Sequence, residues 1–536
     1  MILDHLNLGV TIALAVCGLA DMTKVYARDL MMLQQNSYRN ERYQRWFSQS
    51  GESTNLGRIF CCVALMFLLV ERIPVFASAI VGIVVTIAQL VNLCRQHYKK
   101  PLAWTNRAKR IYATMWVISA IIAGVVGGLC GLKALCEVII AMLIASPLIL
   151  LAANDLLRPV EKHINRKYYN EAASILASMP DLKIIGITGS YGKTSTKHYL
   201  HRILEEHFST AMTPGSFNTT LGVIRTVREY LKPYNEVFIV EMGAKQPGDI
   251  KEICDLVHPD LGIITAVGEQ HLESFGSIEN VQHTKFELAD AIPADGVVVV
   301  NEDFPYVANR EVKNTDCIRY SVHSESGKGV GGNADYVATD IEYTPEGTRF
   351  KLVGPGMKAP LELTTRLIGE CNVSNLLAAV IVALKLGVPE EKIKYAVGQI
   401  EQVEHRLSLK RTPAGVTIID DAFNSNPQGS KMALEALAMM KPGKRIVITP
   451  GMIELGSLQE EANREFGHNI AKNADVAIVV GRYNREAILA GIDDVKDSKV
   501  KVLGVDSFAE AQAELQKIVA PGDFVLYEND LPDTFK

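Results

Sequence analysis

A short run of glycine and hydroxyl residues stands between an apolar segment and a helix-compatible segment, and its residue types suit phosphate binding. The apolar run Ile184 to Ile187 leads into Gly189-Ser-Tyr-Gly-Lys-Thr194, and residues 195–207 suit a helix. Glycines let backbone N–H groups approach phosphate oxygens, and a helix N-terminus adds positive potential. The expected phosphate-binding residues are Gly189, Ser190, Gly192, Lys193, Thr194 and Ser195.

Two side chains of this loop have distinct expected roles. Lys193 is placed to reach the β- and γ-phosphates of a nucleotide, and the Thr194 hydroxyl is placed to ligate Mg²⁺. The loop lacks the usual first glycine, because Ile187 stands five residues before Gly192. A tight strand-to-helix turn is the alternative interpretation, but it does not explain the adjacent Lys-Thr pair.

Composition excludes several classes of protein. The chain of 536 residues has a formal net charge of −5, which gives no sign of a nucleic-acid surface. None of its nine cysteines is spaced as a CxxC pair, so neither a zinc site nor a disulfide framework is indicated. Free thiols fit a reducing cytosol for the soluble part.

The apolar content is concentrated before residue 155 and predicts a membrane region. A span needs about 20 apolar residues, and the first two candidate segments are shorter than that. The segments are Leu6–Ala20, Ile59–Val70, Ile73–Cys94, Ile111–Gly131 and Leu132–Ala153, with a tight turn expected at Glu71 to Pro74. Residues 1–157 are therefore expected to form about five transmembrane helices.

The basic residues give this region an orientation. Lysines and arginines gather in 23–58, 95–110 and 158–167, whereas the turns 71–72 and 131–133 hold one cation each. With five spans all three basic segments fall on one side, which the positive-inside rule assigns to the cytoplasm. We therefore expect a multi-pass protein of the cell membrane with its C-terminal region in the cytoplasm.

From residue 168 the pattern alternates between apolar strands and helical periodicity. Strands are expected at 184–187, 237–240, 262–266, 297–300, 416–420, 445–449, 476–480 and 524–527. This alternation predicts an α/β fold of parallel sheets covered by helices, with ligands at the carboxyl ends of the strands. Residues 311–366 are polar and glycine-rich, with strands expected at 336–343 and 348–353, and suggest a small β insertion.

Further polar clusters accompany the loop. They are Thr213 to Gly222, Phe238 to Gly243, Gly268 to Ser277, His283 to Glu287, Gly369 to Asn375, Glu404 to Arg406, Asp420 to Pro427 and Gly451 to Gly456. Together, over roughly residues 180–530, they resemble the Mur ligase family of ATP-dependent amide-forming enzymes. The branch that adds D-alanyl-D-alanine to a UDP-muramoyl tripeptide is the most similar. The resemblance implies a P-loop central ATPase domain at 168–405 and a Rossmann-like domain at 406–536.

The resemblance also implies a reaction and a metal site. In such enzymes ATP converts a carboxylate into an acyl phosphate, which an amine then attacks, so charge on phosphate oxygens must be stabilised. Two Mg²⁺ ions are implied, with Thr194, Glu241, His271 and Lys285 as the metal-site residues. Lys285 corresponds to a lysine that is carbamylated in the family. The implied catalytic residues are Lys193, Asn218, Glu241, His271 and Lys285.

The remaining implied residues contact the nucleotide. Asn375 matches an asparagine on the adenine side, Arg406 matches an arginine that contacts phosphate, and Asp421 matches an acid near the ribose, with Asn424 beside it. Each has an ordinary alternative role as a cap, a turn residue or a surface ion pair. For Met452 and Glu454, packing in a loop is as good an interpretation as a site role.

Departures from the family concern the substrate. Cys371-Asn372 replaces a His-Asn pair, Tyr527 to Asp533 replaces a basic glycine-containing motif, and a membrane region stands where the UDP-binding domain is usual. The leading hypothesis is a membrane-associated ligase that couples an amino acid or dipeptide amine to a small or lipid-linked muramoyl peptide, a peptidoglycan precursor. The alternatives are a ligase of the folylpolyglutamate or polyglutamate type, and a nucleotide-binding membrane scaffold without turnover.

Overall fold

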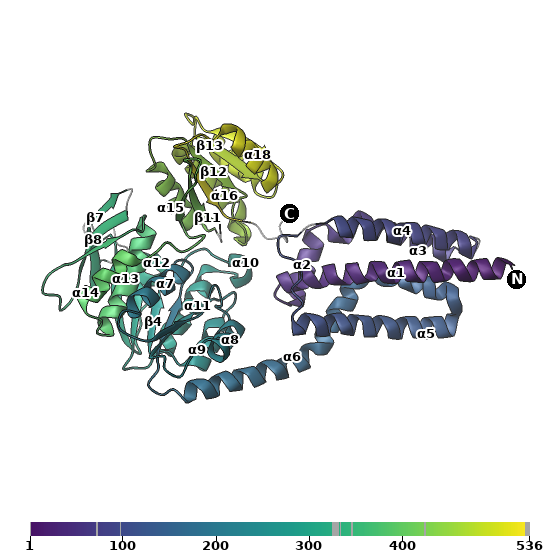
Figure 1. Cartoon of the computed structure of the whole chain (residues 1–536), viewed down its shortest axis with the longest axis horizontal. Coiled ribbons are helices and arrows are strands. Elements are labelled where there is room, and N and C mark those ends of the chain that lie inside the picture. The colour runs from purple at the N-terminus through teal and green to yellow at the C-terminus, as the bar shows by residue number, and fades with distance from the viewer. Residues whose placement is uncertain are drawn as a thin grey trace. The chain divides into compact units, whose positions relative to one another are not determined.

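The computed structural model describes residues 2–70, 73–96, 98–323, 332, 334–344, 347–422 and 425–530. The chain divides into two compact units, the first ending at Arg166 and the second running from Lys167 to Asp530. The first unit is helical and the second is built on two sheets (Figure 1).

The helical unit is a bundle in which α1, α3, α4 and α5 lie side by side (Figure 1). Its helices are α1 (Ile2–Gln35), α2 (Asn40–Gln49), η1 (Glu52–Thr54), α3 (Leu56–Leu69), α4 (Val75–Arg95), α5 (Asn106–Ile144) and the start of α6 (Ser146–Ala177). Leu14, Met22 and Tyr26 are buried between the helices. Large apolar side chains such as Val84 and Val125 are exposed on the outside, as expected of helices that meet lipid.

Three helices are long and apolar enough to cross a membrane: His5–Gln35, Val75–Arg95 and Asn106–Gly131. The pair Lys133–Ile144 and Ser146–Ala177, bent by 75°, makes a fourth if it counts as one span. Helix α3 has 14 residues, so it is about 21 Å long and shorter than a hydrocarbon core of about 30 Å. Among the described residues, fewer helices than the five expected spans are therefore long and apolar enough to cross a membrane. Residues 71–72 of the expected turn lie outside the described residues.

The second unit contains a nine-stranded sheet in the order β2-β3-β1-β4-β5-β6-β7-β8-β9. Its strands are β1 (Lys183–Thr188), β2 (Thr210–Met212), β3 (Val237–Glu241), β4 (Leu261–Ile264), β5 (Val297–Asn301), β6 (Asp316–Ser321), β7 (Tyr336–Thr344), β8 (Gly347–Val353) and β9 (Leu361–Thr365). Pairing is parallel from β2 to β7 and antiparallel from β7 to β9. The strands expected in the glycine-rich segment thus continue this sheet, while Gly327, Gly329 and Gly331 lie outside the described residues.

Helices cover both faces of this sheet. They are α7 (Lys193–Leu204), α8 (Thr220–Glu229), α9 (Asp249–Val257), α10 (Leu272–Phe275), α11 (Ile278–Ala291), α12 (Pro305–Ala308), α13 (Glu370–Lys385) and α14 (Glu390–Gln399). One apolar core includes α7, α13 and α14, and a second includes α8, α9 and α11. Strand β1 lies between β3 and β4, so it is an interior strand of the sheet.

A second sheet has six strands in the order β10-β11-β15-β12-β13-β14. Its strands are β10 (Ser408–Arg411), β11 (Thr417–Asp421), β12 (Arg445–Thr449), β13 (Val476–Val480), β14 (Lys501–Val505) and β15 (Phe524–Glu528), and its helices are η3 (Gly456–Leu458), α15 (Pro427–Ala438), α16 (Gln459–Asn473), α17 (Arg485–Asp493) and α18 (Phe508–Ile518). Strand β10 pairs antiparallel with β11, and the other neighbouring strands of this sheet pair in parallel. The expected α/β fold with mostly parallel sheets is confirmed.

Candidate active site

The glycine loop leaves the carboxyl end of β1 and enters α7 at Lys193. Gly189 has φ 150° and Gly192 has φ 78°, conformations that favour glycine. A Cβ atom on Gly192 would lie 2.1 Å from Asn375 Oδ1, and one on Gly189 would lie 2.1 Å from Thr265 Oγ1. Both positions therefore require glycine because the loop packs directly against neighbouring residues.

Hydrogen bonds hold the loop in a compact shape. Lys193 Nζ donates to the carbonyl oxygens of Gly189 at 2.6 Å and Ser190 at 3.3 Å. Ser190 Oγ donates to Gly268 O at 3.0 Å, which ties the loop to the segment after β4. Burial lowers the pKa of Lys193 to about 8, although Glu241 acts in the opposite direction. The ammonium group of Lys193 thus lies within the loop that is expected to hold phosphate.

Glu241 ends β3 and gathers three side chains. Thr194 Oγ1 donates to Glu241 Oε1 at 3.1 Å, and Asn218 Nδ2 donates to the same oxygen at 3.0 Å. Lys197 Nζ lies 3.0 Å from Glu241 Oε2, and neither side chain is more than 1% exposed. Burial favours the neutral acid, but Lys197 and then Lys193 lower the pKa of Glu241 below its ordinary value. Glu241 is therefore ionised beside the Thr194 hydroxyl.

Lys197 was not among the residues expected from the sequence. A helical lysine is ordinarily solvated, yet this one is fully buried. Lys197 stands four residues after Lys193 and therefore lies on the same face of α7. This spacing is the only feature of the sequence that indicates a place for Lys197 near the loop.

His271 meets a residue from the second sheet. Its Nδ1 forms a hydrogen bond with Glu454 Oε2, which lies in the loop after β12. Burial lowers the pKa of His271 below 6.5 and outweighs Glu454, while Lys245 and Lys285 lower it further. A neutral imidazole oriented by a carboxylate through one nitrogen is the usual form of a metal-binding histidine. Glu454 was expected either to pack within its loop or to belong to the active site. Its hydrogen bond with His271 places it next to the candidate site.

Lys285 is 2% exposed on α11, and its Nζ lies 5.9 Å from the centroid of the Phe275 ring. Burial and the nearby charge of Lys193 bring the pKa of Lys285 well below its ordinary value. Within the described part of the chain, no carboxylate lies within ion-pair distance of its Nζ. The amine is thus driven toward its neutral form.

Two of the residues expected to contact the nucleotide lie on α13 and at the end of β11. Asn375 on α13 accepts a hydrogen bond from Thr196 Oγ1 at 3.3 Å. Asp421 Oδ1 accepts from the backbone N–H of Leu407 at 3.0 Å, and burial raises the pKa of Asp421 to about 6 against the opposing charge of Arg406. The positive charge of Arg406 also lowers the pKa of Lys193. Asn424 lies outside the described residues.

The oxygens of Thr194 and Glu241 are the donor type that Mg²⁺ prefers, and they lie at one place. His271 and Lys285 form a second group that meets Glu454 and Phe275 instead. Across the residues described, no three side chains of His, Cys, Asp and Glu are grouped as a metal cage. This donor set fits an ion that keeps several waters and shares phosphate oxygens, as Mg²⁺ commonly does.

The fold and the loop together define an α/β protein with a glycine loop at the carboxyl end of an interior strand of a mostly parallel sheet. The description "Mur ligase middle domain" matches residues 187–383, and "Mur ligase, glutamate ligase domain" matches residues 405–527. The chain belongs to the Mur ligase family.

Several relatives that it matches are named UDP-N-acetylmuramoyl-tripeptide–D-alanyl-D-alanine ligase. The Bacillus subtilis protein is 32% identical over 289 residues, which cover 53% of this chain and 59% of the relative. The Mycobacterium leprae protein is 33% identical over 387 residues, which cover 66% of this chain and 72% of the relative. The chain thus spans less than two thirds of the length of the Bacillus subtilis relative.

Solved structures of MurF share the fold. Crystal structure I of MurF from Acinetobacter baumannii has a TM-score of 0.61 and 27% identity, and the match covers 68% of this chain and 77% of that one. MurF ligase from Thermotoga maritima in complex with ADP has a TM-score of 0.59 and 25% identity, covering 68% and 80%.

Proposed function

We propose that this chain is an ATP-dependent ligase that forms an amide bond on a peptidoglycan precursor, with D-alanyl-D-alanine as the amine. The observation that carries the proposal is the contact of Thr194 with Glu241 directly beside the Lys193 loop, in a chain of the Mur ligase family. The names of the relatives and the ADP complex of the Thermotoga maritima protein support the choice of substrate and nucleotide.

The reaction has two balanced steps. A carboxylate oxygen of the acceptor attacks the γ-phosphorus of ATP, the bond to the β,γ-bridging oxygen breaks, and ADP leaves. The amine then attacks the acyl carbon, the bond between that carbon and the phosphate oxygen breaks, and phosphate leaves as the amine loses a proton. Lys193 and Arg406 would offset charge on the transferred group.

The residues around Glu241 would hold Mg²⁺ before either step. Thr194 and Glu241 supply oxygen ligands, Asn218 orients the carboxylate, and Lys197 keeps it ionised. Magnesium supplies charge neutralisation at the phosphate oxygens when bound. His271, with its ring fixed by Glu454, and Lys285 would serve a second ion.

The test is amine-dependent release of ADP and phosphate by detergent-purified protein supplied with UDP-muramoyl tripeptide and D-alanyl-D-alanine. Lys193→Ala is expected to abolish release. Lys183→Ala is the matched control, because that lysine is 58% exposed and lies at the start of β1, the strand that leads into the loop. Mass spectrometry of the product separates a muramoyl peptide from a polyglutamate-type product. If no combination of acceptor and amine led to release of ADP and phosphate, a nucleotide-binding scaffold without turnover would be favoured instead.

We propose further that residues 1–157 place the ligase at the cytoplasmic side of the cell membrane and that the acceptor is lipid-linked. The domains at 168–405 and 406–536 would then work on a substrate at the bilayer. The three helices apolar enough to span a membrane support this location. Ligation of only the UDP-linked tripeptide, with lipid-linked muramoyl peptide ignored, would contradict the choice of acceptor.

Carbamylation of Lys285 is proposed as part of the same site. A neutral amine attacks carbon dioxide, a C–N bond forms, a C–O π pair moves to oxygen, and the nitrogen loses a proton. The buried Lys285 suits this reaction because its low pKa favours the neutral amine. The product is an anion able to support a metal ion. Carbon-13 NMR with labelled bicarbonate should show a carbamate signal that Lys285→Met removes.

A further inference from the structure

A short segment just before β10 carries Arg406 on a strained backbone. His405 has φ 58° and Leu407 has φ 50°, so both residues that flank Arg406 lie in the left-handed region. Residues other than glycine rarely adopt this conformation, because it brings the Cβ atom close to a carbonyl oxygen. Such strain persists only where the surrounding structure holds the chain in place, and it is concentrated at functional sites. The segment 405–407 therefore needs support from its neighbours.

Two consecutive aspartates at the end of β11 supply that support. His405 Nδ1 forms hydrogen bonds with Asp420 Oδ1 at 3.0 Å and with Asp420 Oδ2 at 2.9 Å. Leu407 N donates to Asp421 Oδ1 at 3.0 Å, and the Leu407 side chain is buried in the core of the second sheet. Each residue that flanks Arg406 is thus fixed by one aspartate.

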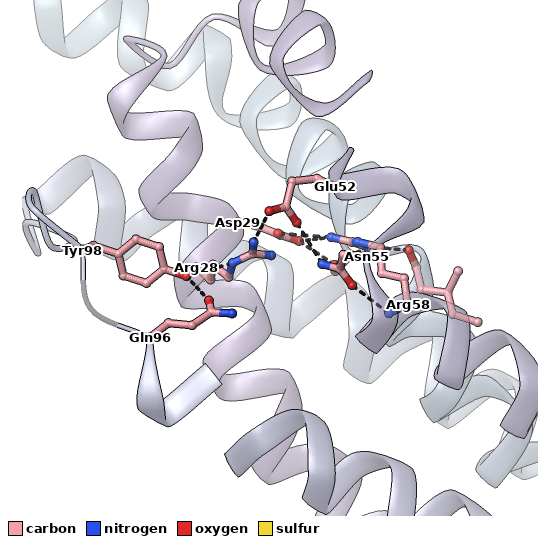
Figure 2. Close-up of polar contacts among 9 residues, drawn as sticks. Arg28, Asp29, Glu52, Asn55, Arg58, Gln96 and Tyr98 are labelled. Atoms are coloured by element: carbon pink, nitrogen blue, oxygen red, sulfur yellow. Dashed lines mark hydrogen bonds and ion pairs between the residues drawn. The ribbon is translucent and has the colours of Figure 1, made fainter. Parts of the chain in front are cut away.

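Glu52 and Asp29 in the helical unit contact residues whose backbone is regular, unlike Asp420. Glu52 pairs with Arg28, and Asp29 pairs with Arg58 at 3.3 Å (Figure 2). Both arginines stand in helices, α1 and α3, whose backbone hydrogen bonds hold the chain without these pairs. Asp420 instead binds a residue with a left-handed backbone, so this contact decides the course of the chain itself.

Arg406 lies within electrostatic reach of the glycine loop. Burial lowers the pKa of Arg406, and the negative charges of Asp421 and Glu241 act in the opposite direction. Burial also lowers the pKa of Lys193, and the charge of Arg406 lowers it further. The guanidinium of Arg406 is therefore near β3 and the loop, while its backbone belongs to the segment before β10.

We propose that His405 and Asp420 are positioning residues that present Arg406 to the phosphate groups of the nucleotide. Their hydrogen bonds stabilise the left-handed conformation of His405, and this conformation sets the direction in which the next residue, Arg406, leaves the chain. The inference rests on the proposed function, because Arg406 is taken to contact phosphate.

A second partner of Asp420 supplies a matched control. Lys410 Nζ lies 2.9 Å from Asp420 Oδ2, but Lys410 stands within β10, opposite Ile418 of β11, where pairing of the strands fixes the backbone. Loss of the Lys410 side chain removes a charge from the same carboxylate without releasing the segment 405–407. A network that acted only through surface charge would respond alike to the loss of Lys410 and of His405.

The test is equilibrium titration of the full chain in detergent with Mg²⁺ and the non-hydrolysable ATP analogue adenylyl imidodiphosphate. Arg406→Ala is expected to weaken binding about tenfold or more, since a charge-assisted contact with phosphate is lost. Asp420→Ala and His405→Ala should each weaken binding about fivefold, because the left-handed conformation is no longer supported. Lys410→Ala should change binding by about twofold or less, as expected of an exposed ion pair.

Two further variants separate positioning from general stabilisation. In Asp420→Ala/Arg406→Ala, binding should be no weaker than in Arg406→Ala alone, because Asp420 acts through the arginine. His405→Gly should bind the analogue more tightly than His405→Ala, because glycine adopts a φ near 58° without a supporting hydrogen bond.

Four results would overturn the inference. Additive losses in the double variant would show that Asp420 does not act through Arg406. Equal losses in Lys410→Ala and His405→Ala would assign the effect to surface charge, and equal binding by His405→Gly and His405→Ala would show that the backbone conformation is immaterial. Unchanged binding by Arg406→Ala would overturn the inference together with the role proposed for Arg406, whereas release of ADP by the wild type would still decide the ligase function.

Discussion

Lys197 Nζ lies 3.0 Å from Glu241 Oε2, and both side chains are buried. The same ammonium group donates to the carbonyl oxygen of Gly215 at 2.6 Å, so it joins α7, β3 and the loop before α8. Because the pair is closed to solvent, each charge depends on the other. The pair therefore fixes the carboxylate that is expected to receive the metal ion.

Replacement of Lys197 by methionine should destabilise the protein. Removal of one partner leaves a buried carboxylate uncompensated, which costs about 3–5 kcal/mol. A loss of this size should lower the thermal unfolding midpoint by roughly 5 °C for a unit of this size. The measurement is thermal unfolding of the full chain in detergent, with Lys183→Met as the exposed control.

A double variant separates pairing from packing. In the double variant Lys197→Met/Glu241→Gln a neutral amide replaces the buried carboxylate. A large part of the lost stability should therefore return. If the double variant were as unstable as Lys197→Met, the lysine would stabilise the protein through packing of its alkyl chain instead.

ATP binding should take up a proton at Lys193. Burial lowers the pKa of Lys193 to about 8, so at pH 8.5 roughly three quarters of the molecules carry a neutral amine. Phosphate favours the ammonium form and draws a proton from the buffer. Calorimetry at pH 8.5 in buffers of different ionisation enthalpy should report this uptake, and Lys193→Met should show none.

The same pKa makes a prediction for stability. A lysine whose pKa falls from 10.5 in the unfolded chain to about 8 in the fold binds fewer protons when folded between these values. The contribution of Lys193 to the free energy of unfolding, measured without ATP, should therefore rise as the pH increases from about 8 to 10.5. Lys193→Met should flatten this rise, and an unchanged slope in the variant would assign it to other groups.

Gly192→Ala should weaken ATP binding at least about tenfold, since a Cβ atom would overlap Asn375 Oδ1 and the positive φ disfavours alanine. Asn375→Ala in the same chain removes the overlap and keeps the backbone strain. Gly387→Ala is the control, because Gly387 has φ 81° and nothing within 4 Å of its Cβ position. Nucleotide titration of these variants separates overlap from strain, and full binding by Gly192→Ala would contradict the packing described here.

The strand pattern of the sequence predicted the elements that position the site. Ile184 to Ile187 and residues 237–240 appear within β1 and β3, and their parallel pairing brings Thr194 and Glu241 together. Strands β2, β6, β9, β10 and β14 were not expected. Residues 210–212 form only a three-residue edge strand, and Lys501–Val505 is only partly buried at the other edge of its sheet.

The contacts missed by sequence reasoning depend on tertiary packing. Glu454 reaches His271 across 183 positions of chain, a distance at which no local pattern operates. Lys197 is buried only because α7 packs between β3 and the loop at Gly215. In the helical unit, hydropathy identified the apolar segment of α3 but not its packing against α4 and α5, which makes a 14-residue helix part of the bundle.

Two buried aspartates in the helical unit should respond differently to the same change. Asp29 accepts from Arg58 and Ser146, whereas the carboxylate oxygens of Asp21 have no hydrogen-bond partner among the described residues. Asp29→Asn leaves the buried Arg58 short of a counter-charge and should cost about 3–5 kcal/mol. Asp21→Asn removes an uncompensated acid and should leave stability unchanged or raise it. Thermal unfolding of both variants in detergent decides the matter, and equal destabilisation would show that Asp21 has a partner of its own.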